Sequence, residues 1–204
     1  RHLGSEGRTE EGIELRAHPI LVPESSLIAG VNDVSNAVMV NADAVGTTLY
    51  YGPGAGSEPT ASAVIADVVD IARVMDSYPD SWVPPLGCDT AQLQQQKIMD
   101  IEDVETGFYI RFSALDKPGV LSDVTKIMGD AGISIEAIIQ REQPAGEHYV
   151  NVIILTNVTK EKFLDEAVVH IEKLATVRGN VNFIRLEYLD QVLSLIHISE
   201  PTRR

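Results

Sequence analysis

The chain has 204 residues, of which 44% are hydrophobic, and a formal net charge of -14 at pH 7. This length is enough for one large or two small domains, and the apolar content is ordinary for a globular protein with a buried core. The acidic balance argues against nucleic acid or an anionic membrane surface as a partner. No apolar run approaches the about 20 residues of a membrane span.

The first residues and the only cysteine bear on the compartment. Arg1 to Glu11 is polar and lacks the apolar stretch of a signal peptide, so we predict a loop or a frayed end there and no export. Cys88 cannot form an internal disulfide, which fits a reducing compartment, and we expect a cytoplasmic protein. The sequence does not begin with Met, which suggests part of a longer protein or a processed product.

The first half of the chain predicts three strands and one long helix. Gly12 to Val22 alternates apolar and polar residues, and Leu27 to Val31 suits a short helical turn. Asn36 to Asn41 and Gly46 to Tyr51 indicate the two strands of a hairpin. The helix follows, with apolar residues three to four positions apart from Ala61 to Met75. We expect these elements to form one small α+β piece.

A glycine loop joins the second hairpin strand to this helix, with three glycines at alternate positions: Gly52, Gly54 and Gly56. Glycine allows positive φ and close approach of another molecule to the backbone. We expect Ser57 or Glu58 to cap the helix and Pro59 to lie in its first turn. The unpaired N–H groups of a helix start suit an anionic or polar ligand, although a plain turn explains the same pattern.

The loop is not a full dinucleotide fingerprint. The pattern G-x-G-x-x-G places its third glycine one residue later than Gly56, and no parallel strand clearly follows the helix. A cofactor site here is therefore partial and must be completed by other protein.

Prolines and Gly87 interrupt regular structure from Ser77 to Thr106, so we interpret this span as a connection between domains, with one helical turn at Gln92 to Gln96. Four carboxylates cluster near its end: Asp100, Glu102, Asp103 and Glu105. Because they alternate with Ile101 and Val104, a solvated linker face fits them better than a metal site. We assign no metal ligand.

The second half follows a different plan. Strands are predicted at Phe108–Ala114, Ile133–Ile139, Tyr149–Thr156 and Val181–Tyr188, and helices at Val120–Ala131 and Phe163–Leu174. We expect Gly132 and Gly179 to mark the ends of the two helices. The order is β-α-β-β-α-β, the ferredoxin-like plan, in which both helices cover one face of the sheet. The other face must be covered, usually by a second copy or another domain.

The turn before the first of these helices is a candidate ligand site. Pro118 sets the turn, and Gly119 lets the backbone approach a ligand closely. The N–H groups of Gly119, Val120 and Leu121 lack helical acceptors and suit a carboxylate, while Asp116 suits an ammonium group. A plain turn and helix cap is the competing interpretation.

Two stretches resemble known families. Glu11–Pro19, Ala42–Gly46, Tyr51–Gly56 and Pro59–Val64 resemble the C-terminal part of bacterial homoserine dehydrogenase. Leu115–Leu121, within a βαββαβ unit, resembles the ACT domain, a regulatory module that commonly binds amino acids. The resemblance covers nearly everything from Thr9 to Asp190. It predicts an α+β protein with a partial catalytic domain followed by a ferredoxin-like ACT domain.

The resemblance implies NAD(P)-dependent interconversion of homoserine and aspartate semialdehyde, with feedback control typically by threonine, in a homo-oligomer. It implies that Gly56 lies beside the cofactor, with Gly54 and Gly52 as weaker matches. The residues that match the ACT effector loop are Asp116, Gly119, Val120 and Leu121. Ile133 and Ser134 match positions that often border the effector of a neighbouring subunit.

The departures from the family pattern matter equally. The N-terminal nucleotide fold is absent, and no lysine occurs between Arg1 and Gln96, so we assign no catalytic residue and expect no turnover by this chain alone. The alternative is a stand-alone amino-acid-binding module without catalysis. We predict domains at 1–76 and 107–190, a linker at 77–106, and at 191–204 an adaptor-like tail that is not part of the fold.

Overall fold

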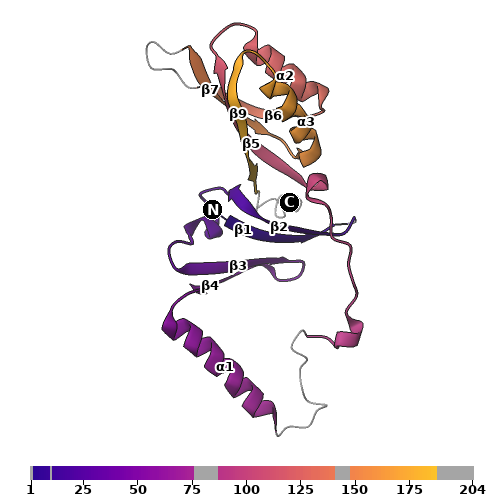
Figure 1. Cartoon of the computed structure of the whole chain (residues 1–204). Coiled ribbons are helices and arrows are strands. Elements are labelled where there is room, and N and C mark those ends of the chain that lie inside the picture. The colour runs from indigo at the N-terminus through magenta and orange to yellow at the C-terminus, as the bar shows by residue number, and fades with distance from the viewer. Residues whose placement is uncertain (1, 10, 76–86, 141–147, 188–204) are drawn as a thin grey trace, which may run out of the picture. The chain divides into compact units, whose positions relative to one another are not determined.

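The computed structural model describes residues 2–9, 11–75, 87–140 and 148–187 (Figure 1). The chain divides into two compact units, residues 1–23 together with 96–204, and residues 24–95. Each unit is described by itself. The domain limits predicted after residues 76, 106 and 190 remain predictions.

The first unit is built on one sheet with the strand order β1-β2-β9-β5-β7-β6, in which β8 also pairs with β5. The strands are β1 (His2–Arg8), β2 (Ile13–Leu21), β5 (Glu105–Leu115), β6 (Ile135–Gln140), β7 (Tyr149–Thr156), β8 (Thr159–Lys160) and β9 (Val177–Leu186). The part β9-β5-β7-β6 is antiparallel throughout and has the strand order of the predicted ferredoxin-like plan. The end of β2 extends it by parallel pairing of Ile20 and Leu21 with β9.

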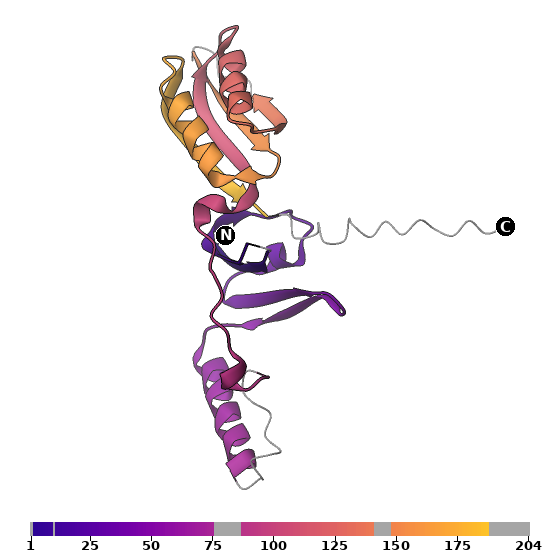
Figure 2. The ribbon, with the colours of Figure 1, turned by 90° about the vertical axis from the view of Figure 1, so that its right-hand side faces the viewer.

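Two helices, α2 (Val120–Asp130) and α3 (Glu161–Glu172), lie on the same face of this sheet (Figure 2). Alternate residues of β5 point under them, namely Phe108, Ile110, Phe112 and Ala114, and all four are buried. Val124, Met128, Leu164 and Ile171 of the helices complete the core. Strands of period two and helices of period 3.6 thus direct their apolar sides into one layer.

The end of α2 has the predicted glycine. Gly132 has φ 74°, and its N–H donates to the carbonyl of Gly129, while the N–H of Ile133 donates to the carbonyl of Met128. This is a Schellman motif, which requires a left-handed residue that glycine adopts without strain.

Two predictions for this unit are wrong. The polar segment Arg1 to Glu11 is not only loop, because β1 pairs with β2 along its whole length. Gly179 does not mark the end of α3, which stops at Glu172. It lies instead within β9 with φ 74°. There β9 accommodates extra residues, because Ser113 of β5 pairs with Arg178 while Arg111 pairs with Asn182.

The second unit holds a hairpin of β3 (Ser35–Ala42) and β4 (Gly46–Pro53), the helix α1 (Ser57–Met75) and the 3-10 turns η1 (Leu27–Gly30) and η3 (Thr90–Gln92). The hairpin and helix are where the sequence predicts them. The late helical turn lies at Thr90–Gln92, not at Gln92–Gln96, and the turn η4 (Ile101–Asp103) of the first unit is not predicted. The expected α+β piece is divided, because β2 belongs to the other sheet.

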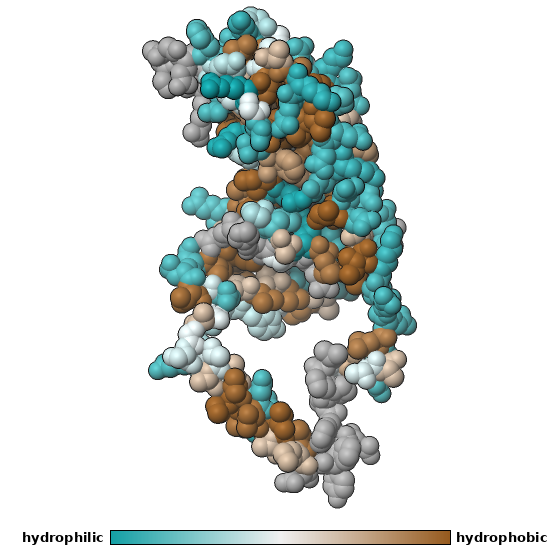
Figure 3. Space-filling view, viewed as in Figure 1, coloured by the Kyte–Doolittle hydropathy of each residue, from teal (hydrophilic) through white to brown (hydrophobic). Residues whose placement is uncertain are grey.

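The helix α1 presents apolar side chains to solvent. None of its residues is buried, and its exposed apolar residues include Val64, Ile65, Val68 and Ile71 (Figure 3). The periodicity predicted the helix correctly, but no packed face accompanies it within the described residues. Its start also differs from the expectation: the carbonyl of Gly56 accepts from Thr60, so Gly56 is the cap residue, in place of Ser57 or Glu58.

The core position Leu164 on α3 offers a direct test of this packing. Its side chain has no exposed surface, whereas Val169 on the same helix is 50% exposed. Leu164→Ala should lower the free energy of unfolding by about 2–5 kcal/mol, because it removes buried methyl groups and leaves a cavity. Val169→Ala should change it by less than about 0.5 kcal/mol. Urea unfolding followed by circular dichroism measures both, and equal effects would contradict the assigned core.

Candidate functional site

A small cavity of about 160 Å³ lies where β5 ends and α2 begins. The turn Asp116–Gly119 and the first residues of α2, Val120 and Leu121, form one side of it. Three buried residues of the neighbouring strands, Ala114, Val150 and Val152, also line it. The cavity is well below the about 300–1,000 Å³ that suits a drug-sized ligand, so a molecule of the size of a small amino acid fits it better.

The backbone of this turn is arranged to donate hydrogen bonds. Gly119 is the cap residue of α2 and adopts the left-handed conformation, with φ 94° and ψ -25°, which a residue with a Cβ rarely adopts. Among the described residues, the N–H groups of Gly119 and Leu121 have no acceptor, and that of Val120 makes only a long contact of 3.4 Å to the carbonyl of Lys117. The turn therefore offers donors at the positive end of the helix dipole.

Asp116 begins this turn and also lines the cavity. Its own N–H donates to the carbonyl of His148 at 3.0 Å, which fixes the backbone at the end of β5. Its carboxylate accepts a hydrogen bond of 3.2 Å from the side-chain amide of Gln140, the last residue of β6. The cavity thus presents a carboxylate and main-chain donors together, which is the pairing that an amino-acid zwitterion requires.

Four of the predicted effector residues, Asp116, Gly119, Val120 and Leu121, line this one cavity. Gln140 also lines it and is missed by the sequence reading. Nothing in the local sequence marks Gln140 as a site residue. Its position beside the turn can be inferred only when the pairing of β6 with β7 is known.

Ile133 and Ser134 do not line the cavity. Ile133 is part of the buried core, and the hydroxyl of Ser134 accepts a hydrogen bond of 3.0 Å from Asn157. They precede β6, whereas Gln140 ends it, so the strand rise places them about 20 Å from Gln140 in the same chain. A role for these two residues in ligand binding therefore stays a prediction that involves another subunit.

The three glycines of the loop in the second unit differ from one another. A Cβ at Gly54 would overlap the side chain of Asn36, so a larger residue there would force this exposed side chain to turn away. Gly56 has φ 132° directly before α1, and open space surrounds the position of a Cβ at Gly52. Packing against Asn36 thus favours glycine at position 54. Gly52 leaves the backbone accessible, and Gly56 has a positive φ.

The carboxylates near Asp100 form no metal site in the part of the chain that is described. No group of three or more metal-binding side chains is present among those residues. Asp103 instead lies 2.7 Å from the ammonium of Lys162, and this hydrogen bond lowers the pKa of Asp103. Nor does any helix of the described ranges have the length and apolarity needed to cross a bilayer.

A buried polar cluster stands where β2 meets β9. The guanidinium of Arg185 on β9 holds the carboxylate of Glu161, the first residue of α3, with its Nε at 2.7 Å. Arg16 on β2 contacts Glu187, just after β9, at 3.3 Å. His18 lies in the same cluster, where its Nδ1 is 3.1 Å from the carbonyl of Pro19. This cluster connects the N-terminal strands to the sheet and helices that form the cavity.

Residues 108–167 match the family model "ACT domain", and residues 1–69 match the family model "Homoserine dehydrogenase". The sheet, the two helices and the cavity at Asp116 therefore define an ACT domain. Comparison with individual proteins identifies what it is joined to.

Homoserine dehydrogenase from Pseudomonas aeruginosa is 48% identical over 190 residues, which are 93% of this chain and 44% of that protein. The enzyme from Neisseria gonorrhoeae is 45% identical over 92% of this chain and 43% of its own length. The crystal structure of a homoserine dehydrogenase from Thiobacillus denitrificans superposes with a TM-score of 0.80 at 48% identity, over 91% of this chain and 42% of that one. The chain belongs to the homoserine dehydrogenase family and combines part of its dehydrogenase domain with an ACT domain. It spans less than half the length of these relatives.

The polar cluster predicts how stability depends on pH. Burial lowers the pKa of His18 from 6.5, and the positive charges of Arg185 and Arg16 lower it further, against a raising effect of the Pro19 carbonyl and Glu161. Because the folded pKa is the lower one, the stabilisation is complete above the unfolded value of 6.5 and is lost as the pH falls through the folded pKa. His18→Gln should therefore lose less stability than the parent on acidification from about pH 7.5 to about pH 5.5. Urea unfolding at both pH values measures this, and parallel losses would contradict it.

Proposed function

We propose that the chain is the C-terminal part of an NAD(P)-dependent homoserine dehydrogenase, which interconverts L-homoserine and L-aspartate 4-semialdehyde in threonine and methionine biosynthesis. In this proposal the ACT domain senses a free amino acid, most simply the end product threonine, in the cytoplasm. The observation that carries the regulatory part is the cavity that Asp116 lines together with Gly119 and Leu121, whose N–H groups have no acceptor among the described residues.

The chemistry of this cavity supports an amino acid. Its carboxylate can take the ammonium group of the ligand, and the helix start can take the ligand carboxylate. The floor of Ala114, Val150 and Val152 leaves room for a short apolar or hydroxyl side chain. The small volume of about 160 Å³ disfavours large amino acids and nucleotides.

The glycine loop is proposed as one wall of the nicotinamide site. The backbone at Gly52 is open, Gly56 turns the chain with φ 132°, and α1 begins at the next residue, so N–H groups of its first turn are near the loop. The fit is partial, because Gly54 accommodates Asn36. The cofactor supplies the hydride chemistry, and the part of this chain is limited to shaping the wall.

We also propose that two copies pair through the ACT domain. β6 is an edge strand of the sheet, and Ile138 and Ile139 on it are 39% and 46% exposed. An unpaired apolar edge favours strand addition by a second copy. Ile133 and Ser134, which directly precede β6, would then lie close to the partner, which is the role that the family resemblance implies for them.

The alternative function is a stand-alone amino-acid-binding module. It shares the effector cavity, so effector binding does not separate the two. The genomic sequence upstream of Arg1 does: an uninterrupted reading frame that encodes a nucleotide-binding fold and substrate lysines supports the dehydrogenase, and a start codon near Arg1 supports the module.

Threonine binding by the whole chain tests the proposed cavity. Asp116→Ala should weaken the binding of L-threonine by at least about 10-fold in calorimetry, because it removes a charge-assisted contact of about 1.5–3 kcal/mol. Asp130→Ala, the same change at the other end of α2, should leave binding unchanged. Binding of threonine that is insensitive to Asp116→Ala would refute this site, and glycine and L-methionine in parallel titrations would identify a different effector.

Turnover of homoserine provides a second test. The 204-residue chain should show no NAD(P)-dependent oxidation of homoserine, because it offers no nucleotide fold and no lysine before Lys97 for proton transfer. Absorbance at 340 nm, where reduced nicotinamide absorbs, measures this reaction with either cofactor. Activity of the purified chain above a sample without protein would contradict the assignment of the chemistry to residues outside it.

A further inference from the structure

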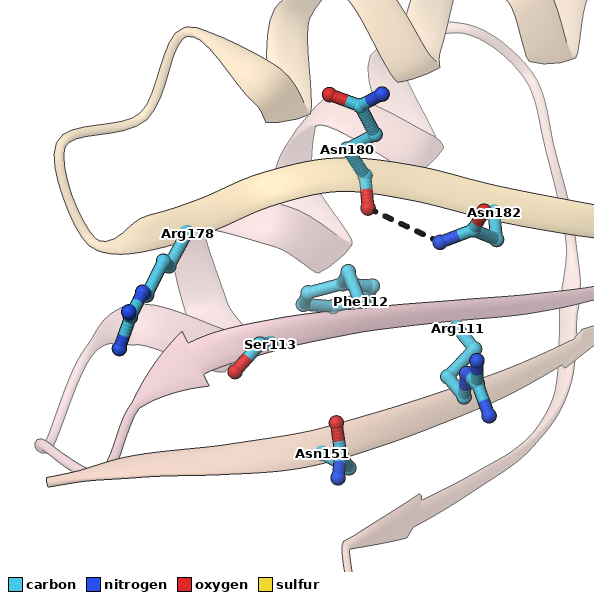
Figure 4. A pocket seen from close by; sticks show the side chains of 7 residues that line it. All are labelled: Arg111, Phe112, Ser113, Asn151, Arg178, Asn180 and Asn182. Carbon is cyan, nitrogen blue, oxygen red and sulfur yellow. Dashed lines mark hydrogen bonds between the residues drawn. The ribbon is translucent and has the colours of Figure 1, made fainter. Parts of the chain in front are cut away.

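The face of the ACT sheet that no described helix covers has a depression of about 240 Å³ (Figure 4). Its polar lining comes from three adjacent strands and consists of Arg111, Ser113, Asn151, Arg178, Asn180 and Asn182. Phe112 contributes only from below, because its side chain is buried on the opposite, helix-covered side. The depression therefore lies on the other face of the sheet from Ala114, Val150 and Val152, which line the cavity at Asp116.

The strand register brings these side chains together. Ser113 of β5 is the Cα partner of Asn151 on β7 and of Arg178 on β9, while Arg111 is the partner of Asn182. Partners in an antiparallel pair point to the same face and lie about 5 Å apart. Arg111 is two residues, or about 7 Å, along β5 from Ser113. The two arginines thus lie on one face of the sheet but at opposite ends of the depression (Figure 4). Arg178 leans toward Tyr149, which is level with Leu115, whereas Arg111 is two residues before Ser113.

The charge of this depression is opposite to that of the chain. The sequence has 30 acidic and 16 Lys or Arg residues, yet none of the described residues that line the depression is acidic. Arg16, Arg73 and Arg185 each contact a carboxylate. Within the described ranges, Arg111 and Arg178 have no such partner. Instead, the guanidinium of Arg178 lies over the ring of Tyr149, 5.4 Å from its centroid, which orients it without neutralising it.

We propose that this depression binds a small anionic molecule through its phosphate or carboxylate group, at a site separate from the effector cavity. The guanidinium of Arg111 at one end and that of Arg178 at the other can each donate to the oxygens of an anion in the depression, and the amides of Asn151 and Asn182 supply further donors at the rim.

Nuclear magnetic resonance of the full chain tests this proposal. Pyrophosphate and succinate, each titrated at constant ionic strength, represent the two kinds of anionic group. We expect amide shifts at residues 111–113, 151 and 178–182 with a dissociation constant of about 1 mM or tighter for at least one of them. The probe that binds assigns the group. The double variant Arg111→Gln/Arg178→Gln should weaken this binding by at least about 10-fold.

Arg73→Gln is the matched control, because Arg73 is an exposed arginine on α1 of the second unit and is not among the residues that line the depression. It should bind like the parent. Resonances of the buried core report whether the double variant is folded. If it is unfolded, the residues whose amide resonances shift in the parent chain decide whether the anion binds in the depression. The proposal is overturned if neither probe gives saturable shifts, if the shifts map to residues 116–121 instead, or if a folded double variant binds like the parent. A second copy that covers this face would give the first of these results.

Discussion

The alternation of β5 is the constraint on which both sites depend. Phe108, Ile110, Phe112 and Ala114 are fixed under the two helices by burial, so a shift of one residue would expose them and bury Arg111 and Ser113. With that register, β5 ends at Leu115, Asp116 follows as the first residue after the strand, and Gly119 caps the start of α2. The hydrophobic core therefore positions the cavity at one end of β5 and the arginine depression on its open face.

The effector cavity is formed largely by backbone, which explains why its chemistry is readable from few residues. Gly119 supplies a left-handed cap, and the donors that follow belong to any helix start. Asp116 and Lys117 are the charged residues among the described ones that line it, and the Asp116 carboxylate accepts a hydrogen bond from Gln140. At the far edge of the sheet, the ion pairs of Arg185 with Glu161 and of Arg16 with Glu187 connect α3 and β9 to the N-terminal strands. These contacts join α3 and the ACT sheet to the strands β1 and β2.

The apolar periodicity within each segment predicted most helices and strands. It failed where pairing with a strand distant in the sequence determines the structure. β7 matches its predicted limits because Val150, Val152 and Ile154 alternate without interruption. β1 has no such pattern in His-Leu-Gly-Ser-Glu-Gly-Arg and is a strand through pairing with β2. Gly179 was read as a helix end, but its positive φ serves the irregularity of β9. Arg111 and Arg178 are 67 positions apart, and only the register of β5 with β9 places them on one face of the sheet.

Hydrogen exchange with and without L-threonine tests the central claim most directly, because it reports where a ligand orders the backbone. The account predicts slower exchange in peptides that cover residues 115–123 and in those that contain Gln140 and Val150–Val152, with no change along α1. Unchanged exchange in the turn at saturating threonine and other small amino acids, or protection confined to the second unit, would contradict it.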